Sequence, residues 1–314
     1  MLNLRVKSIN YEAVDINRYE LVDVDGKDLP GFVAGSHIDV HVQGKYIRQY
    51  SLCNDPRETK RYEFAVLNVK GGRGGSAAIH EGIRVGDVIK VSEPRNNFKL
   101  SSDANRHLLI AGGIGITPLM SMLEDLSANS RSFELHYCCR SSDRAAFKER
   151  LNELDGNGQI HFHFDNGNLN ESLSVSELLK QHPEGTHLYY CGPTGLMAAI
   201  AEACTGWPAG TVHCEHFVAP VVDKPAIEGT FQIKIASTGQ TLPVPPELSI
   251  ADVLKSAGIE CETSCEAGLC GTCRTRYLEG EPDHGDYILD DDEHSQYLTV
   301  CCSRSKSEML VLDL

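Results

Sequence analysis

The chain has 314 residues and a formal net charge of −15 at pH 7, with 41% hydrophobic and 23% charged residues. This length favours two or three domains over a single core. The negative charge argues against nucleic acid as a partner, because phosphate binding needs a basic face. The first residues, MLNLRVKSIN, have no apolar signal-peptide core, and the longest apolar run, 108–123, is too short to span a bilayer. We therefore expect a cytoplasmic protein with no membrane partner.

Residues 1–101 have the pattern of an antiparallel β-barrel. The stretches HIDVHVQGKYIRQYSL, RYEFAVLNV and DVIKVSEP alternate apolar with polar residues or are rich in β-branched ones. Gly, Asn and Pro interrupt them at short intervals, as in strands joined by tight turns. Short, closely spaced strands of this kind are typical of a small barrel.

Residues 102–218 change to an alternation of strands and helices. We expect strands at HLLIAGG, FELHYCC, QIHFHF, HLYYCG and GTVHCEHF. Between them we expect helices at TPLMSMLEDLSA, RAAFKERLNEL, SVSELLKQH and GLMAAIAEAC. Such alternation predicts an α/β domain whose parallel sheet is covered on both faces.

Residues 219–229 contain two Pro and no periodicity, which indicates a linker. In the third domain, 230–314, we expect a hairpin at TFQIKIAS and QTLPVP, a helix at SIADVLKSAG, and closing strands at YLTVCC and MLVLDL. Between 225 and 314 there are 16 acidic and 6 basic residues, a net charge of −10. This excess is either a solvated face or a docking surface for a basic partner protein.

Three of the twelve cysteines fall in the stretch CEAGLCGTC, as Cys265, Cys270 and Cys273. Clustered Cys in a cytosolic chain of this size indicate metal or redox chemistry rather than disulfides. Their spacing is that of a plant-type [2Fe–2S] cluster, which needs one further distant Cys. Structural zinc is the alternative, but it prefers two CxxC pairs. The stretch VCCS, 300–303, offers two thiols, and alternation along a strand lets only one face the loop.

Two stretches of the first domain suggest a site for an aromatic cofactor with a phosphate. In RQYSL, 48–52, the Arg48 guanidinium has the shape to bind a phosphate. Tyr50 offers a flat face for an aromatic ring, and Ser51 offers a small hydroxyl that can bond a ring edge. In GGRGGS, 71–76, a glycine-rich turn followed by Ser presents N–H groups to an anion. A surface Arg–Tyr pair and a flexible hairpin tip are the ordinary alternatives.

Two stretches of the second domain fall at the carboxyl ends of predicted parallel strands, where ligands bind in open sheets. GGIGITP, 112–118, resembles a dinucleotide-binding loop in which Pro118 replaces the third Gly. Because Pro is favoured at the first position of a helix, Thr117 before it is expected to be the N-cap. Its glycines permit close approach of a pyrophosphate, although tight packing also favours Gly. YYCGP, 189–193, follows the fourth strand, and a buried core role is the alternative for Cys191.

The stretches CEAGLCGTC, EPDHGDYILDDDE and VCCSR resemble the C-terminal ferredoxin domain of the phthalate dioxygenase reductase family. RQYSL, GGRGGS, GGIGITP, YYCGP and CEHF match that family in order, so the resemblance covers nearly the whole chain. It implies a β-grasp fold for the third domain and FMN as the flavin. It also implies that the fourth ligand of a [2Fe–2S] cluster is Cys301, with Cys302 as a bystander.

The resemblance also implies the remaining site residues. The FMN site would comprise Arg48, Gln49, Tyr50, Ser51, Ala65, Val66, Leu67, Gly74, Gly75, Ser76, Thr117 and Phe217. The NAD site would comprise Gly113, Gly115, Arg140, Cys191, Gly192 and Pro193. Ser51 and Cys191 would be the catalytic positions. Arg140 could attract a 2′-phosphate, but Asp143 would oppose one, so we expect NADH rather than NADPH.

In function, the resemblance implies the reductase component of a two-component Rieske-type oxygenase or demethylase. NADH would give a hydride to FMN, and single electrons would pass through the [2Fe–2S] cluster to a terminal oxygenase docked on the acidic domain. Hydride transfer needs no general acid or base, so none of the 13 His is assigned a catalytic role. Two other classes remain open: a stand-alone NADH oxidase or flavin reductase, and a cluster-based redox sensor.

Overall fold

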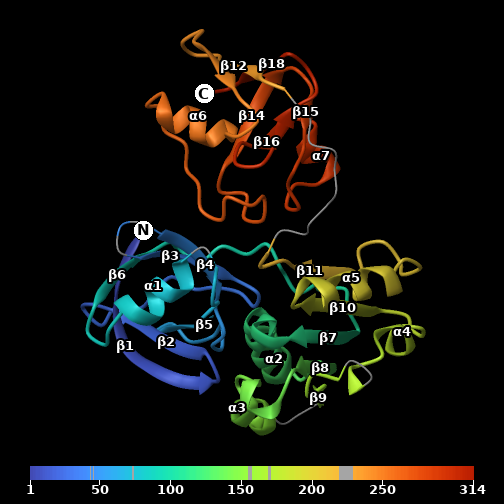
Figure 1. Cartoon of the computed structure of the whole chain (residues 1–314). Helices are drawn as coiled ribbons and strands as arrows, with labels where there is room; N and C mark the ends of the chain where they lie inside the picture. Colours follow the sequence, from blue (N-terminus) through green and yellow to red (C-terminus); the bar gives the residue numbers. More distant parts are fainter. Residues whose placement is uncertain (43, 45, 73, 155–157, 169–170, 219–228) are drawn as a thin grey trace. The chain divides into compact units, whose positions relative to one another are not determined.

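The computed structural model describes the chain except for residues 43, 45, 73, 155–157, 169–170 and 219–228, and forms two compact units, Met1–Phe217 and Val218–Leu314 (Figure 1). The predicted linker, 219–229, lies outside the described residues apart from Gly229. Among the helices that are described, none has both the length and the apolar character needed to cross a membrane.

The first sheet of unit 1 has six strands, all paired antiparallel, in the order β4-β3-β6-β1-β2-β5. They are β1 (Leu2–Ala13), β2 (Ile16–Asp23), β3 (His37–Val42), β4 (Tyr46–Ser51), β5 (Tyr62–Leu67) and β6 (Val88–Val91). Just beyond β4, Leu52 forms a bridge with Phe64 of the opposite edge strand, and Cys53 N–H donates to Glu63 O at 2.9 Å. These contacts join the two edges, so the predicted barrel is confirmed.

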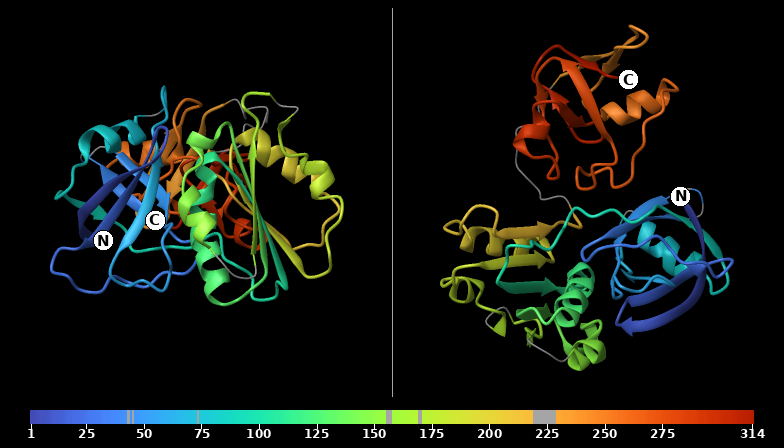
Figure 2. Two further views of the ribbon diagram at one scale, coloured as in Figure 1. Left: turned by 90° about the horizontal axis from the view of Figure 1, so that it is seen from below. Right: turned by 180° about the vertical axis from the view of Figure 1, so that it is seen from behind.

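The second sheet of unit 1 is parallel and has the order β11-β10-β7-β8-β9. Its strands are β7 (Arg106–Gly112), β8 (Phe133–Cys139), β9 (Gly158–Phe164), β10 (Thr186–Cys191) and β11 (Val212–Glu215). Helix α2 (Ile116–Ala128) packs on one face, whereas α4 (Val175–Leu178) and α5 (Thr194–Ala203) pack on the other (Figure 2). The predicted parallel sheet covered on both faces is confirmed.

Three elements of this region are shorter than predicted. Helix α3 is confined to Lys148–Glu153 because Phe147 has a left-handed φ of 59° and buries its ring before the helix starts. Helix α4 ends at Leu178, and the next residue, Leu179, is buried with its carbonyl accepting the Trp207 indole N–H at 3.3 Å. Strand β11 ends at Glu215, before Phe217.

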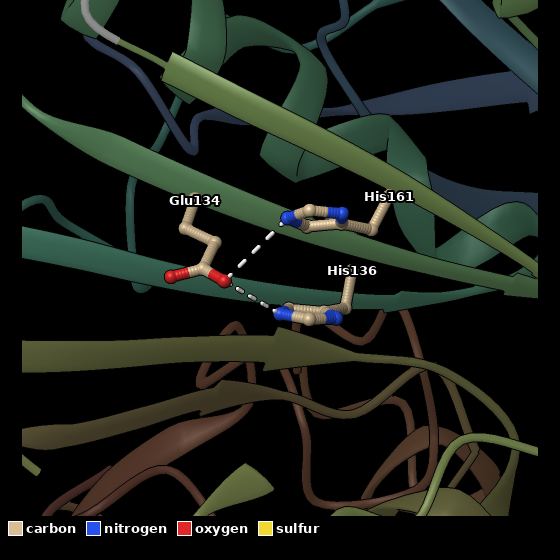
Figure 3. A group of neighbouring side chains, drawn as sticks. All are labelled: Glu134, His136 and His161. Atoms are coloured by element: carbon tan, nitrogen blue, oxygen red, sulfur yellow. Dashed lines mark hydrogen bonds and ion pairs between the residues drawn. The ribbon is translucent and has the colours of Figure 1, made fainter.

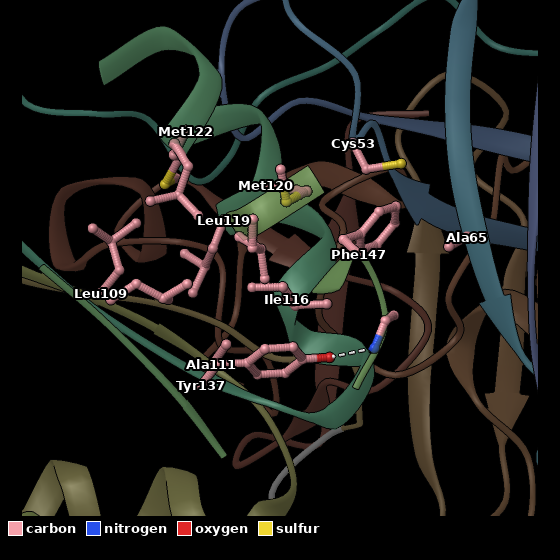
Figure 4. Close-up of a cluster of buried hydrophobic side chains, with 14 of the residues drawn as sticks. Cys53, Ala65, Leu109, Ala111, Ile116, Leu119, Met120, Met122, Tyr137 and Phe147 are labelled. Atoms are coloured by element: carbon pink, nitrogen blue, oxygen red, sulfur yellow. Dashed lines mark hydrogen bonds between the residues drawn. The ribbon is translucent and has the colours of Figure 1, made fainter. Parts of the chain in front are cut away.

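The barrel and the parallel sheet share one hydrophobic core. Cys53 and Ala65 of the barrel belong to the same buried cluster as Ile116 and Met120 of α2 and Tyr137 of β8 (Figure 4). Apolar burial of this kind stabilises the contact by about 25 cal/mol per Å² removed from water. The two sheets of unit 1 are therefore held in a fixed arrangement by common packing.

A buried carboxylate adds a polar link between barrel and sheet. The Glu63 side chain is 1% exposed and pairs with Arg18, with Arg61 at 3.2 Å and with Arg150 of α3 at 3.2 Å. Arg150 also pairs with Glu124 of α2 at 2.7 Å. A buried acid of this kind is stable only when it is fully paired, so the network requires α2 and α3 to stay against the barrel.

Unit 2 is an α+β fold with a mixed sheet in the order β13-β12-β18-β14-β16. The strands are β12 (Phe231–Ile235), β13 (Thr241–Val244), β14 (Arg274–Glu279), β16 (Tyr297–Thr299) and β18 (Met309–Leu312), and β15 (Pro282–Asp283) pairs separately with β17 (Arg304–Ser305). Helix α6 (Ile250–Ser256) packs its apolar side on this sheet and begins with a capping box between Ser249 and Asp252. A short helix, α7 (Asp291–His294), precedes β16.

Candidate functional site

The predicted flavin-phosphate residues come together at the start of helix α1 (Gly75–Gly82). The chain enters this helix through Gly74, which has a left-handed φ of 82°. A Cβ added to Gly75 would lie 2.5 Å from Nε of Arg48, so the glycine lets the Arg48 side chain lie against the first turn. An arginine beside a helix N-terminus is suited to a phosphate. The stretch is thus a loop entering a helix and not a hairpin tip.

The other predicted flavin residues lie on neighbouring strands of the barrel. Tyr50 is half-buried and its ring centroid lies 5.2 Å from that of Phe64. Gln49 has a buried Nε2 with no hydrogen-bond partner among the described residues. A buried unpaired donor costs free energy, so a cofactor acceptor atom at this position would stabilise it. Ala65, Val66 and Leu67 end β5, with Ala65 and Val66 buried.

The two predicted nucleotide stretches are in backbone contact at the carboxyl ends of β7 and β10. A Cβ on Gly115 would lie 2.2 Å from the Cys191 carbonyl oxygen, and one on Gly112 would lie 2.5 Å from Cδ of Pro193. The absence of a side chain at Gly115 therefore allows the loop to pack closely against β10. Gly113 differs, because its φ is 53° and a Cβ there would meet nothing within 4 Å. Its backbone borders open space, as close approach of a ligand requires.

The predicted cap of helix α2 is wrong. The helix begins at Ile116 with Gly115 as N-cap, and Thr117 lies in its first turn, 2% exposed. The Thr117 hydroxyl donates to the Ile114 carbonyl at 3.0 Å and caps no N–H group. Pro118 still fits the first turn, since the N–H groups there have no partner within the helix.

A residue that the sequence analysis missed joins the two predicted catalytic positions. Ser51 at the end of β4 donates a hydrogen bond to Oε2 of Glu215 at 3.1 Å, and Glu215 is the strand partner of Cys191. Burial raises the pKa of the Glu215 carboxyl to about 7, although the bond from Ser51 lowers it in part. In the sequence, the sign of this residue is that Glu215 is an acidic residue within the otherwise strand-like stretch GTVHCEHF.

Cys191 itself is completely buried, and burial raises its pKa well above the usual range, with the nearby Glu215 adding to the effect. Its thiol is therefore protonated and cannot act as a base or nucleophile at neutral pH. This arrangement is closer to the alternative of a core cysteine. The residue lies at the end of β10 beside Gly192.

Of the other predicted residues of unit 1, Arg140 and Phe217 are exposed and Ser76 is half-buried. Arg140 follows β8, and Asp143, in the next turn, accepts a hydrogen bond from the Ser141 hydroxyl. Phe217 is 39% exposed at the end of the unit. Ser76, in the first turn of α1, accepts a hydrogen bond from the Val69 N–H at 3.2 Å.

In unit 2 the Cys265 thiol adjoins those of Cys270 and Cys301, and Cys273 lies three residues after Cys270 in the same loop. Cys270 and Cys273 are buried, whereas Cys265 and Cys301 are half-buried. The Cys270 thiol lowers the pKa of Cys265, but the adjoining Cys301 thiol and burial raise it above the usual range overall. Backbone N–H groups also point at the sulfurs, from Leu269 to Cys265 at 3.3 Å and from Thr272 to Cys270 at 3.4 Å. Crowded thiols with N–H donors fit an iron–sulfur cluster, whose sulfurs need such donors.

The expected strand YLTVCC is wrong in its second half. Strand β16 ends at Thr299, and Val300–Cys302 form a turn in which Cys302 N–H donates to Thr299 O at 3.2 Å. The Cys302 sulfur lies 3.0 Å from the Thr299 hydroxyl oxygen, while Cys301 adjoins Cys265. The two thiols thus have different neighbours because of the turn and not because of strand alternation.

A protein that takes electron pairs from a nucleotide and releases single electrons needs both a flavin and a one-electron centre. Unit 1 joins a barrel with a candidate phosphate site to a parallel sheet with a candidate nucleotide loop, and unit 2 holds the four cysteines that are predicted as cluster ligands. The fold and sites define this protein as a flavin and iron–sulfur electron-transfer reductase, and comparisons with known proteins agree. Three family models match: an oxidoreductase FAD-binding domain at 3–100, the N-terminal domain of a dimethylamine monooxygenase subunit DmmA-like family at 88–210, and a 2Fe-2S iron-sulfur cluster binding domain at 233–306.

Relatives match over the full chain. The reductase subunit of a tert-butanol monooxygenase / tert-amyl alcohol desaturase from Aquincola tertiaricarbonis is 49% identical, with 100% of this chain and 96% of that protein covered. A vanillate O-demethylase oxidoreductase from Pseudomonas sp. is 47% identical, with both chains fully covered.

Two solved structures are also similar over the whole chain. Phthalate dioxygenase reductase, described as a modular structure for electron transfer from pyridine nucleotides to [2Fe–2S], has a TM-score of 0.75 at 39% identity, with 98% of it covered. An intact type IV self-sufficient cytochrome P450 monooxygenase has a TM-score of 0.88 at 36% identity, and this chain spans 41% of its length. The chain belongs to the phthalate dioxygenase reductase family.

The family and fold-class predictions are therefore confirmed, as is the prediction of an oxidoreductase that uses a flavin, a [2Fe–2S] cluster and a pyridine nucleotide. The electron-transfer interpretation is favoured over the stand-alone oxidase and the redox sensor, because the relatives are reductase components. The individual site residues remain predictions that rest on the geometry described above.

Proposed function

We propose that this chain is the reductase component of a cytoplasmic two-component Rieske-type oxygenase or demethylase, with FMN as its flavin and NADH as its donor. Three of its full-length relatives are vanillate O-demethylase oxidoreductases, and others are reductases of phthalate dioxygenases. When bound, the flavin accepts a hydride and the [2Fe–2S] cluster carries single electrons.

In this proposal the barrel binds and orients the flavin. Arg48 and the N–H groups at the start of α1 hold its phosphate, with Ser76 in the same turn. Tyr50 supplies a flat face, and the unpaired Nε2 of Gln49 donates to a ring acceptor. The Ser51–Glu215 pair closes the same end of β4 and can hold a proton near the ring.

The parallel sheet binds NADH at its carboxyl edge. Gly113 lets the pyrophosphate approach the loop, and Gly192 and Pro193 border the same loop from β10. Cys191, completely buried, fixes the strand end. Asp143 disfavours a 2′-phosphate by charge repulsion.

The four thiols of Cys265, Cys270, Cys273 and Cys301 hold the iron. They must lose their protons to do so, and the N–H groups of Leu269 and Thr272 favour the charged sulfurs. Exposed acids flank this loop. They comprise Glu260, Glu262, Glu266, Asp290, Asp291 and Asp292. We assign them to docking of a basic face of the oxygenase.

The observation that carries the proposal is the convergence of Cys265, Cys270 and Cys301 in a chain that also contains the Arg48–α1 phosphate cradle. It is tested with the purified holoprotein, NADH and a purified Rieske oxygenase component. We expect reduction of the oxygenase's Rieske centre, followed by electron paramagnetic resonance, at a rate that supports turnover. Heat release of the flavin and chromatography should identify FMN.

The competing functions give different results. A stand-alone oxidase would consume NADH and oxygen at an equal rate with or without the oxygenase, and the Rieske centre would stay oxidised. A redox sensor would be reduced once and show no steady NADH turnover. Either result would overturn the proposal, while release of FAD would overturn only the choice of flavin.

A further inference from the structure

Three side chains that the electron-transfer site does not use gather on one face of the parallel sheet. In the β8–β9 register His136 lies opposite His161, and Glu134 precedes His136 by two residues on the same face. The opposite face of these strands carries Leu135, Tyr137 and their neighbours, which pack in the core. Strand periodicity therefore directs Glu134, His136 and His161 together and away from that core, as Figure 3 shows.

The ligand atoms of these three residues converge on one point. Oε1 of Glu134 lies 3.1 Å from Nε2 of His136 and 3.6 Å from Nε2 of His161, and all three atoms lie within 4.8 Å of one another. A tetrahedral metal with ligands at about 2.0–2.2 Å places neighbouring ligand atoms roughly 3.3–3.6 Å apart. Both distances from the carboxylate are close to that range, so a small ion could be bound with little movement of the side chains.

Neighbouring side chains contact the atoms of Glu134 and His136 that do not face the convergence point, and so orient these two residues. Arg106 pairs with Oε2 of Glu134, which leaves Oε1 directed at the imidazoles. Nδ1 of His136 lies 3.0 Å from Nε2 of His163 on β9, so His136 can donate its second ring proton there and turn the Nε2 lone pair outward. Metal-binding histidines regularly have such a partner at the second nitrogen.

Hydrogen bonds within the group do not explain why His161 also faces the Glu134 carboxylate. Only the other tautomer of His136, with its proton on Nε2, would donate a hydrogen bond to Glu134, and His161 at 3.6 Å is beyond hydrogen-bond distance from the carboxylate in either case. The two rings are stacked with centroids 4.9 Å apart. A neutral imidazole offers a lone pair to a metal.

We infer that Glu134, His136 and His161 form a binding site for a divalent transition-metal ion, with its remaining coordination position open to water. Two imidazoles and one carboxylate select Zn²⁺, Ni²⁺ or Cu²⁺ over Mg²⁺ and Ca²⁺, which prefer all-oxygen sites. The site is distinct from the proposed nucleotide edge, because Glu134 and His136 precede the carboxyl end of β8 at Cys139.

The test uses Zn²⁺ on the full-length holoprotein with its flavin and cluster in place. One equivalent is added, and zinc K-edge X-ray absorption reads the ligand types. We expect only nitrogen and oxygen ligands near 2.0–2.2 Å, whereas binding by any of the twelve cysteines would give sulfur near 2.3 Å. A shell that contains sulfur would overturn the inference.

Variants connect the bound ion to these residues. Equilibrium dialysis with metal analysis should show that His161→Ala and Glu134→Gln each weaken Zn²⁺ binding at least about tenfold. His161 is suited to this test because its side chain is 43% exposed and its removal leaves the core intact. Unchanged flavin and cluster absorbance would verify the fold of each variant.

A second histidine pair of the same sheet provides the matched control. Nδ1 of His187 lies 3.0 Å from Nε2 of His213, and their rings are stacked as those of His136 and His163 are, but no described carboxylate bonds to them. His213→Asn should leave zinc affinity unchanged. Equal affinity in the parent protein and in His161→Ala, or a loss in His213→Asn as large as in His161→Ala, would contradict the assignment.

Discussion

The hydroxyl of Ser51 donates a hydrogen bond to Oε2 of Glu215 at 3.1 Å, across 164 residues of sequence. The serine ends strand β4 of the barrel and the glutamate ends strand β11 of the parallel sheet. Because the proposed flavin and nucleotide sites lie on these two sheets, the bond brings a titratable group to the place where they meet. Its carboxyl pKa of about 7 gives the pair a charge that changes near neutral pH.

We predict that Glu215 makes flavin reduction depend on pH. A carboxylate near the ring opposes the gain of negative charge there, so the rate with NADH should fall as pH rises through about 7, where Glu215 loses its proton. Glu215→Gln should flatten this profile in stopped-flow measurements, while Ser51→Ala should move its midpoint upward, because the bond from Ser51 lowers the pKa. A step near pH 7 that persists in Glu215→Gln would refute the assignment.

The same group has a consequence for stability. Its folded-state pKa is raised above the ordinary value of 4.5, so the folded state holds the proton more tightly. The resulting stabilisation is fully present below about pH 4.5 and is lost as pH rises through 7. Glutamine does not titrate, so as pH rises from 5 to 8 the unfolding temperature of Glu215→Gln should increase relative to that of the parent protein.

We predict that NADH is preferred to NADPH because of the exposed Asp143. Its charge repels a 2′-phosphate, and a tenfold preference corresponds to about 1.4 kcal/mol. Asp143→Asn should reduce the preference, and Arg140→Ala should increase it, as measured by kcat/KM for flavin reduction with each nucleotide. Equal rates with the two nucleotides in the parent protein at low concentration would contradict this prediction.

We predict that Cys301 is a cluster ligand and that Cys302 is not. Cys301→Ala should lose the iron and the one-electron acceptor activity, while NADH still reduces the flavin. Cys302→Ser should keep the red-brown absorbance, because the Cys302 sulfur contacts the Thr299 hydroxyl in the turn and a serine can keep that bond. The opposite pair of results would exchange the two assignments.

We predict that Gly268→Ala prevents assembly of the cluster. Gly268 has a φ of 71°, and an added Cβ would lie 2.8 Å from Cα of Asp286 and 2.8 Å from the Cys302 sulfur, so the loop must shift. Gly258→Ala is the matched control, because its φ is 74° but the added Cβ meets nothing within 4 Å. The control should lose only about 1–2 kcal/mol of stability and keep its iron. Equal iron content in both variants would contradict this explanation.

We predict that electron transfer to the oxygenase slows as salt rises, since surface attraction is screened beyond about 8 Å at physiological ionic strength. Flavin reduction by NADH should respond much less. The double change Asp291→Asn and Asp292→Asn should slow transfer at low salt, and Glu149→Gln with Glu153→Gln, on exposed positions of α3, should not. Transfer that is indifferent to salt would favour a merely solvated acidic face.

Local patterns in the sequence were enough to establish the fold class and the class of cofactors. Alternation with period two identified β8 at Phe133–Cys139 without error, and helix α2 differs from its prediction by one residue at its start. These elements follow from local periodicity, which is written in neighbouring residues. The three close thiols are likewise a local pattern, so the spacing of Cys265, Cys270 and Cys273 alone indicates the iron–sulfur centre.

The meeting of distant residues depends instead on tertiary packing. The turn that separates Cys301 from Cys302 depends on hydrogen bonds to Thr299, and the reason for Gly115 is the Cys191 carbonyl on another strand. Glu215 acquires its partner and its raised pKa only when two sheets pack together. The cluster of Glu134 with two histidines exists only in one strand register. Contacts between residues far apart in sequence, and the burial that perturbs their charges, arise from packing, which no local pattern encodes.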